Sequence, residues 1–129
     1  MKSKYCVANW KMNFNNEQGR EFIYNLNSKD LNNGQSQIIL CPSFTSLFSM
    51  VDSCADSLIS VGAQNMYFED SGAYTGEISA QMLKEVGVKF VIVGHSERRH
   101  VFGETDGIVH AKMIQSIKNG LTPILCIGE

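Results

Sequence analysis

The most informative stretch of this chain is Phe90-Val91-Ile92-Val93-Gly94-His95-Ser96-Glu97-Arg98-Arg99. It opens with a continuous apolar, largely β-branched run, which predicts a strand that is buried on both faces of a sheet. Gly94 then permits a sharp change in chain direction. Ser96 is the expected N-cap of a short helical turn, with Glu97 in its first turn. His95 is therefore predicted to lie between the carboxyl end of a strand and the N-terminus of a helix.

This position favours a neutral imidazole at His95. Backbone N–H dipoles at a helix N-terminus disfavour a positive charge on the ring. A neutral ring can donate a hydrogen bond to a substrate oxygen or shuttle a proton, which are catalytic roles. A histidine after a strand can equally be a capping or packing residue, and this stretch alone does not separate the two interpretations.

The rest of the chain repeats the order of strand and helix. Apolar strands are expected at 5–8, 38–41, 58–63, 90–93 and 123–127, the last of them buried. Helices are expected from about residue 17 after Asn15 or Asn16, after Ser43, over 78–86, and after Thr105 or Asp106. About five strands in βαβ units of roughly 30 residues predict an α/β fold with a parallel sheet.

Two details of this assignment can be checked directly. The turn that ends the first unit is expected at Asn32-Asn33-Gly34. The inward face of the last helix is expected to consist of its apolar residues, namely Ile108, Val109, Met113, Ile114 and Ile117.

Polar residues follow the expected strand ends, and they are Asn9, Lys11, Gln64, Asn65, His95, Glu97 and Glu129. Right-handed crossovers bring the carboxyl ends of parallel strands to one edge of the sheet, where α/β proteins bind ligands. A cationic lysine beside an asparagine suits a phosphate or an enolate oxygen. Glu97 could orient Lys11 or His95. A lysine in a loop is more often a solvated surface residue, so Lys11 alone would carry little weight.

The connection from Met66 to Glu77 is much longer than the roughly 4–6 residues that usually join such elements. It contains three aromatic residues, Tyr67, Phe68 and Tyr74. We expect this loop to be functional or to form an interface. An Ω-loop packed on its own domain is the second interpretation.

Length and composition place the chain among ordinary globular proteins, with one domain expected over residues 1–129. It is 43% hydrophobic and 19% charged, and its net charge of −2 gives no reason to expect a nucleic-acid partner. No apolar run reaches the roughly 18–20 residues that span a membrane, and Asn9 and Lys11 interrupt the apolar stretch that a signal peptide would need. A cytoplasmic location is therefore expected.

The remaining reactive residues give no sign of a metal site. The four cysteines, Cys6, Cys41, Cys54 and Cys126, are widely spaced, and we expect reduced core thiols. His95 and His100 are five residues apart, which separates them by about 140° around a helix. Glu104 and Asp106 are expected to pair with Arg98 and Arg99 and to hold the loop, a contribution of roughly 0–1 kcal/mol for exposed pairs.

Four motifs together resemble the triosephosphate isomerase family, in the order and spacing of that family and along the whole chain. They are Asn9-Trp10-Lys11-Met12-Asn13, Gly72-Ala73-Tyr74-Thr75-Gly76-Glu77, Val93-Gly94-His95-Ser96-Glu97-Arg98-Arg99 and Leu125-Cys126-Ile127-Gly128-Glu129. The resemblance implies a (β/α)8 TIM barrel, of which this chain would hold the first five strands and about four helices. It also implies interconversion of dihydroxyacetone phosphate and glyceraldehyde 3-phosphate through an enediolate, with no cofactor and no metal.

The same resemblance implies roles for single residues. Lys11 would neutralise oxyanion and phosphate charge, His95 would be the electrophile and proton shuttle, and Asn9 would position the substrate. Glu97 would be the third catalytic residue and would support the site from beside Lys11. A neutral histidine at a helix N-terminus is an established feature of this family. The Met66–Glu77 loop, with Tyr74 and Thr75, would reach a second subunit near its Asn13 and Phe14 and form a homodimer.

The chain departs from the family in length, because such a barrel has eight strands and about 250 residues. The glutamate base, the mobile lid and the C-terminal phosphate loops of the family have no counterpart here, so residues 1–129 alone are expected to be inactive. Open strand edges would also leave the chain marginally stable or dependent on a second half. Two alternatives stay open: a non-catalytic half-barrel that acts as an interaction subunit, and a phosphate-binding barrel module with different chemistry.

Overall fold

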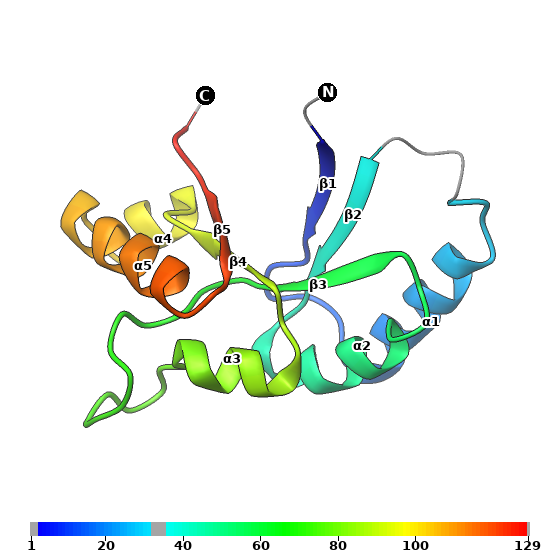
Figure 1. The fold of residues 1–129 in the computed structure, drawn as a ribbon, viewed down its shortest axis with the longest axis horizontal. Helices are drawn as coiled ribbons and strands as arrows, with labels where there is room; N and C mark the ends of the chain where they lie inside the picture. The colour runs from blue at the N-terminus through cyan, green and yellow to red at the C-terminus, as the bar shows by residue number, and fades with distance from the viewer. Residues whose placement is uncertain (1–2, 32–35, 129) are drawn as a thin grey trace.

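The computed structural model describes residues 3–31 and 36–128 (Figure 1). The expected turn at Asn32-Asn33-Gly34 and the residue Glu129 lie outside these ranges. The strands are β1 (Lys4–Asn9), β2 (Ser36–Cys41), β3 (Ile59–Ala63), β4 (Phe90–Val93) and β5 (Thr122–Leu125). The helices are α1 (Asn16–Asn27), α2 (Leu47–Ser53), α3 (Ala80–Val86), α4 (Ser96–His100) and α5 (Asp106–Lys118), and a 3₁₀ turn, η1 (Phe44–Ser46), precedes α2.

The five strands form one parallel sheet in the order β1-β2-β3-β4-β5. The sheet is strongly curved, since the ring of Tyr5 on β1 lies 6.2 Å from that of Phe90 on β4, three strands away. The helices lie on the outer side of this curve (Figure 1). The architecture confirms the α/β prediction and corresponds to part of a TIM barrel.

Side chains alternate between two apolar layers, as β4 illustrates. Val91 and Val93 face the helices and join the larger cluster of buried residues, whereas Phe90 and Ile92 face the inside of the curve and form a smaller one. All four residues are buried. The prediction that this strand is covered on both faces is therefore correct, and the inward face contributes to the core even though the sheet is not closed.

Helix boundaries follow the expected capping chemistry. Asn15 caps α1 in a capping box with Gln18, and Thr105 caps α5 through its hydroxyl group. Gly87 ends α3 in the left-handed conformation. The structure holds five α-helices in its described part rather than about four, because the turn after His95 forms the short helix α4. No helix among the described residues is long and apolar enough to cross a bilayer.

Two predictions about packing are wrong. The last strand, β5, ends at Leu125 and is largely accessible, because it lies at one edge of the described sheet. On α5, Ile114 and Ile117 are 53% and 62% exposed, while Lys112 is only 2% exposed. The helix turns a polar stripe inward because that stripe finds hydrogen-bonding partners there.

The four cysteines are free and differ in burial, and Cys126 is intermediate between the buried and the exposed ones. Cys41 and Cys54 are buried, and burial raises the pKa of the Cys41 thiol to about 12. They fit the prediction of reduced core thiols. Cys6 does not, since it is exposed on β1, the strand at the other edge of the described sheet.

Candidate active site

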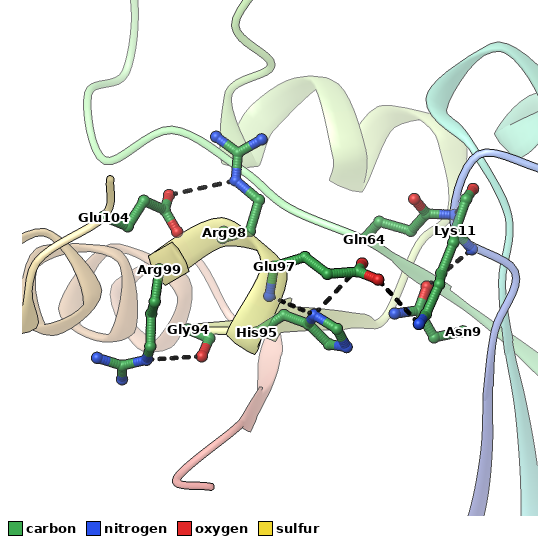
Figure 2. Close-up of polar contacts among 9 residues, drawn as sticks. All are labelled: Asn9, Lys11, Gln64, Gly94, His95, Glu97, Arg98, Arg99 and Glu104. Atoms are coloured by element: carbon green, nitrogen blue, oxygen red, sulfur yellow. Dashed lines mark hydrogen bonds and ion pairs between the residues drawn. The ribbon is translucent and has the colours of Figure 1, made fainter. Parts of the chain in front are cut away.

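Five of the predicted polar residues meet at one edge of the sheet, beyond the carboxyl ends of β1, β3 and β4 (Figure 2). Of the other two, Asn65 binds Lys112, and Glu129 lies outside the described residues. Asn9 is the last residue of β1, and Lys11 follows it. Gln64 follows β3, and His95 and Glu97 follow β4. Parallel topology thus gathers residues that are up to 88 positions apart, from Asn9 to Glu97.

The backbone of Lys11 has an unusual conformation that its neighbours hold in place. Its φ is 56°, in the left-handed region that residues other than glycine rarely occupy. The Lys11 amide donates to Asn9 Oδ1 at 3.0 Å, and Gln64 Nε2 donates to the carbonyls of Lys11 at 2.8 Å and Cys41 at 3.0 Å. Such conformations cost about 1–3 kcal/mol, so these bonds offset strain that serves to aim one side chain.

Glu97 fixes the other end of Lys11. The Lys11 ammonium lies 2.8 Å from Glu97 Oε1, with both side chains about half exposed. The hydrogen bond from Lys11 is the main cause that lowers the pKa of Glu97, and the charge of Lys11 acts in the same direction against partial desolvation. Glu97 is therefore a carboxylate at neutral pH, and it orients Lys11 as the sequence predicts.

His95, and not Ser96, is the N-cap of α4, which corrects the sequence-based prediction. Its Nδ1 accepts a hydrogen bond from the Glu97 backbone N–H at 3.2 Å. A ring nitrogen that accepts a hydrogen bond carries no proton, so this contact is the one expected of the tautomer with its proton on Nε2. Nδ1 also lies 3.6 Å from Glu97 Oε2, which is too long for a hydrogen bond and does not require a charged ring.

Two ion pairs hold the turn that carries His95, as predicted. Arg99 Nε donates to the Gly94 carbonyl at 2.8 Å, and its Nη1 lies 2.6 Å from Asp106 Oδ1. Arg98 Nε lies 3.6 Å from Glu104 Oε1. Gly94 has a φ of 72°, and a Cβ there would lie 2.9 Å from Arg99 Nη2. A side chain at residue 94 would therefore be strained, whereas glycine adopts this left-handed backbone freely.

Two cavities open beside this cluster, and His95 lines both of them. One has a volume of about 240 Å³ and is lined by Asn9, Lys11, Gln64, Glu97 and Phe102, among others. The second has a volume of about 880 Å³ and lies toward β5, where Ser96, Arg99 and Cys126 contribute to its wall. The cluster thus combines a cation held by Glu97, an imidazole ring whose Nδ1 accepts a backbone hydrogen bond, and space for a small anion.

The Met66–Glu77 loop is closed at its base and projects beyond α3 and α5 (Figure 1). The Tyr67 amide donates to the Ile78 carbonyl at 2.8 Å, and the Tyr67 ring lies 4.3 Å from Phe68 and 4.6 Å from Tyr74. Thr75 is exposed. The loop has the compact form of an Ω-loop, with an exposed tip.

Asn13 and Phe14, the residues expected at a subunit contact, lie in the connection between β1 and α1. Asn13 Nδ2 donates to the Trp10 carbonyl at 2.9 Å. The Phe14 ring packs edge-on against Trp10 at 4.9 Å and remains partly exposed. Both residues are thus held in place by Trp10.

Sequence reasoning missed the buried pair of Glu104 and Lys112. Glu104 was expected in an exposed ion pair, yet its side chain is only 6% exposed. Lys112 was not singled out at all. The signal was present, because Lys112 lies at helical spacing between Val109 and Ser116, on the face that α5 buries.

A sequence model described as triosephosphate isomerase matches residues 4–129. Three curated proteins named triosephosphate isomerase are similar to the chain. The protein from Moorella thermoacetica is 42% identical over 129 residues, covering all of this chain and 51% of the relative. A Synechococcus protein is 48% identical, covering all of this chain and 54% of the relative, and the Aquifex aeolicus protein is 47% identical, covering 98% and 51%.

The chain spans about half the length of the curated relatives it matches. The match to the family nevertheless extends over nearly every residue, and the parallel half-barrel has the architecture that this match requires. With fold and sequence in agreement, the chain belongs to the triosephosphate isomerase family.

Proposed function

We propose that this chain supplies the Lys11–His95 half of an isomerase site that interconverts dihydroxyacetone phosphate and D-glyceraldehyde 3-phosphate. The observation that carries the proposal is the Lys11–Glu97–His95 cluster at the carboxyl edge of a parallel half-barrel. Experiments use residues 1–129 joined to the C-terminal half of a relative, which is called the full-length form below.

In this proposal, Lys11 and His95 act on the same small substrate. The His95 Nε2–H donates a hydrogen bond to the substrate carbonyl oxygen. This hydrogen bond becomes stronger as negative charge develops on that oxygen in the enediolate. The Lys11 ammonium offsets the charge of that oxygen and of the phosphate. Asn9 positions the substrate from the wall of the same cavity.

The reaction that the family resemblance implies uses no cofactor or metal ion. Proton abstraction would be carried out by a carboxylate in the part of the relatives that lies beyond this chain. We also propose a cytoplasmic location, in agreement with a glycolytic and gluconeogenic role.

The proposal predicts that the full-length form converts glyceraldehyde 3-phosphate to dihydroxyacetone phosphate, followed by proton NMR without added metal or cofactor. Turnover is expected to survive dialysis against EDTA. His95→Gln is the test variant, because the amide keeps polarity but loses the shuttling nitrogen, and we expect kcat to fall about 100-fold or more. A full-length form that folds but does not turn over either triose phosphate would contradict the proposal.

We further propose that the full-length form is a homodimer joined by the Met66–Glu77 loop, whose tip would pack near Asn13 and Phe14 of the second copy. The projection of this loop and the exposure of Thr75 support the proposal. The Tyr67 ring stacks on Phe68 and packs at a tilt against Tyr74, which braces the loop, so little conformational entropy would be lost on association.

Thr75→Arg is expected to weaken such a dimer by placing an uncompensated charge in a packed contact. Sedimentation equilibrium should show the dimer dissociation constant rise by about 100-fold or more, equivalent to roughly 3 kcal/mol. Thr75→Ser is the matched control and should leave the dimer intact. Equal dissociation constants for the two variants would count against this interface.

A non-catalytic half-barrel subunit is the second candidate. It is favoured by an apolar hollow of about 210 Å³ on the inner face, lined by Tyr5, Val7, Ile39, Phe90 and Ile124 among others. Such a face and the two edge strands could pair with another protein. This candidate predicts binding without turnover in every form of the protein, which the isomerase assay distinguishes.

A further inference from the structure

Lys112 is a fully enclosed cation on α5, outside the catalytic cluster. Its ammonium group donates a hydrogen bond to Asn65 Oδ1 at 2.8 Å and forms an ion pair with Glu104, whose side chain is also buried. Burial of an ionised lysine is costly unless it is paired and hydrogen-bonded. Both partners belong to segments that support the site, so the position of this charge has consequences beyond α5.

The Asn65 contact reaches the backbone support of Lys11. Asn65 follows Gln64, whose amide group donates to the Lys11 carbonyl at 2.8 Å. Lys112 therefore anchors the short segment from which Gln64 extends. A change in the position of Asn65 would move Gln64 and relax the left-handed backbone at Lys11.

The Glu104 contact reaches the second support of Lys11, which is Glu97. Arg98 follows Glu97, and its Nε lies 3.6 Å from Glu104 Oε1, while its guanidinium group lies 4.5 Å from the centre of the Phe102 ring. Arg98 Nε has no hydrogen-bond partner within the described protein, so charge attraction holds it. The same Glu104 oxygen pairs with Lys112, so one carboxylate links Lys112 to Arg98.

We propose that Lys112 is a positioning residue for Lys11, because it ties together the two segments that hold the Lys11 carbonyl and the Lys11 ammonium. The inference rests on the proposed isomerase function in so far as Lys11 acts on substrate. The geometric claim concerns the orientation of Lys11 alone, and it can be measured separately.

The test compares three variants of the full-length form. Lys112→Met removes the ammonium and leaves Glu104 buried without its nearest cation, so it is expected to lower Tm. The double variant Lys112→Met with Glu104→Gln removes both buried charges and is expected to recover much of Tm. Lys118→Met is the matched control, since Lys118 is an exposed lysine at the end of the same helix.

Isomerase activity and the titration of the Glu97 carboxyl group then distinguish a positioning role of Lys112 from a role in stability alone. We expect kcat/KM of the double variant to stay about 100-fold below that of the parent, with KM raised and kcat lowered, because displaced groups lose catalytic power even in a folded protein. Carbon-13 NMR should show the pKa of Glu97 rise toward its usual value of 4.5 as the Lys11 contact loosens. The control should match the parent in both measurements.

The proposal would be overturned if the double variant recovered Tm and also matched the parent in kcat/KM and in the pKa of Glu97. Lys112 would then be a structural residue only. If the parent folds but shows no isomerase activity, the proposed function fails, and the Glu97 titration still decides the role of Lys112.

If the double variant does not fold, Asn65→Ala replaces it, because this variant removes the hydrogen bond from Lys112 to Asn65 and keeps Lys112 paired with Glu104. Unchanged kcat/KM in Asn65→Ala would overturn the proposal as well.

Discussion

Lys11→Ala in the full-length form is expected to lower kcat/KM by about 1000-fold, or roughly 4 kcal/mol of transition-state stabilisation. The loss is large because Lys11 is held at both ends, by Gln64 at its carbonyl and by Glu97 at its ammonium. A cation held in this way need not reorganise as charge develops on the substrate. Steady-state kinetics on glyceraldehyde 3-phosphate, with the folded state checked by circular dichroism, measure the effect.

Lys29→Ala is the matched control for this variant. Lys29 lies between the end of α1 and the start of β2, so the topology places it at the opposite edge of the sheet from the cluster. Its replacement should leave kcat/KM within about twofold of the parent, since surface substitutions far from a site change little. A Lys11→Ala enzyme with near-parental kcat/KM would remove Lys11 from the catalytic machinery.

The sequence was sufficient to predict the strands and the shared edge at which their polar residues meet. Both follow from local patterns combined with a general rule of topology. The run Phe90–Val93 specifies a strand covered on both faces. Right-handed crossovers then place Asn9, Lys11 and His95 on one side without knowledge of any contact.

The inward face of α5 could not be predicted from hydrophobicity, because the partners of its polar residues are distant in sequence. Lys112 is buried through Asn65, which is 47 positions away, and Gln115 through Asp70, which is 45 positions away. Hydrophobic periodicity predicts that Ile114 and Ile117 face the core. The tertiary structure shows instead that α5 buries its hydrogen-bonded polar residues and exposes these two isoleucines. The N-cap of α4 was missed for a related reason, since a histidine ring nitrogen fills a role that is usually assigned to serine.

Residues 1–129 expressed alone are expected to give no measurable isomerase turnover, although they carry both Lys11 and His95. The reaction needs a carboxylate that is free to take a proton from carbon. The carboxylates that line the two cavities beside His95 are Glu97 and Asp106, and each is engaged by a cation, Lys11 and Arg99 respectively. An ion-paired carboxylate is a weaker base, as the lowered pKa of Glu97 illustrates.

The measurement is proton NMR of glyceraldehyde 3-phosphate with the purified chain, against its slow uncatalysed loss in buffer. Adding a separately expressed C-terminal half of a relative should restore turnover if the two parts associate through the inner face and the edges of β1 and β5. Restored turnover should disappear when the chain carries Lys11→Ala, which ties the activity to this site. Turnover by residues 1–129 alone that scales with concentration and is lost in Lys11→Ala would mean that a carboxylate of this half is itself the base.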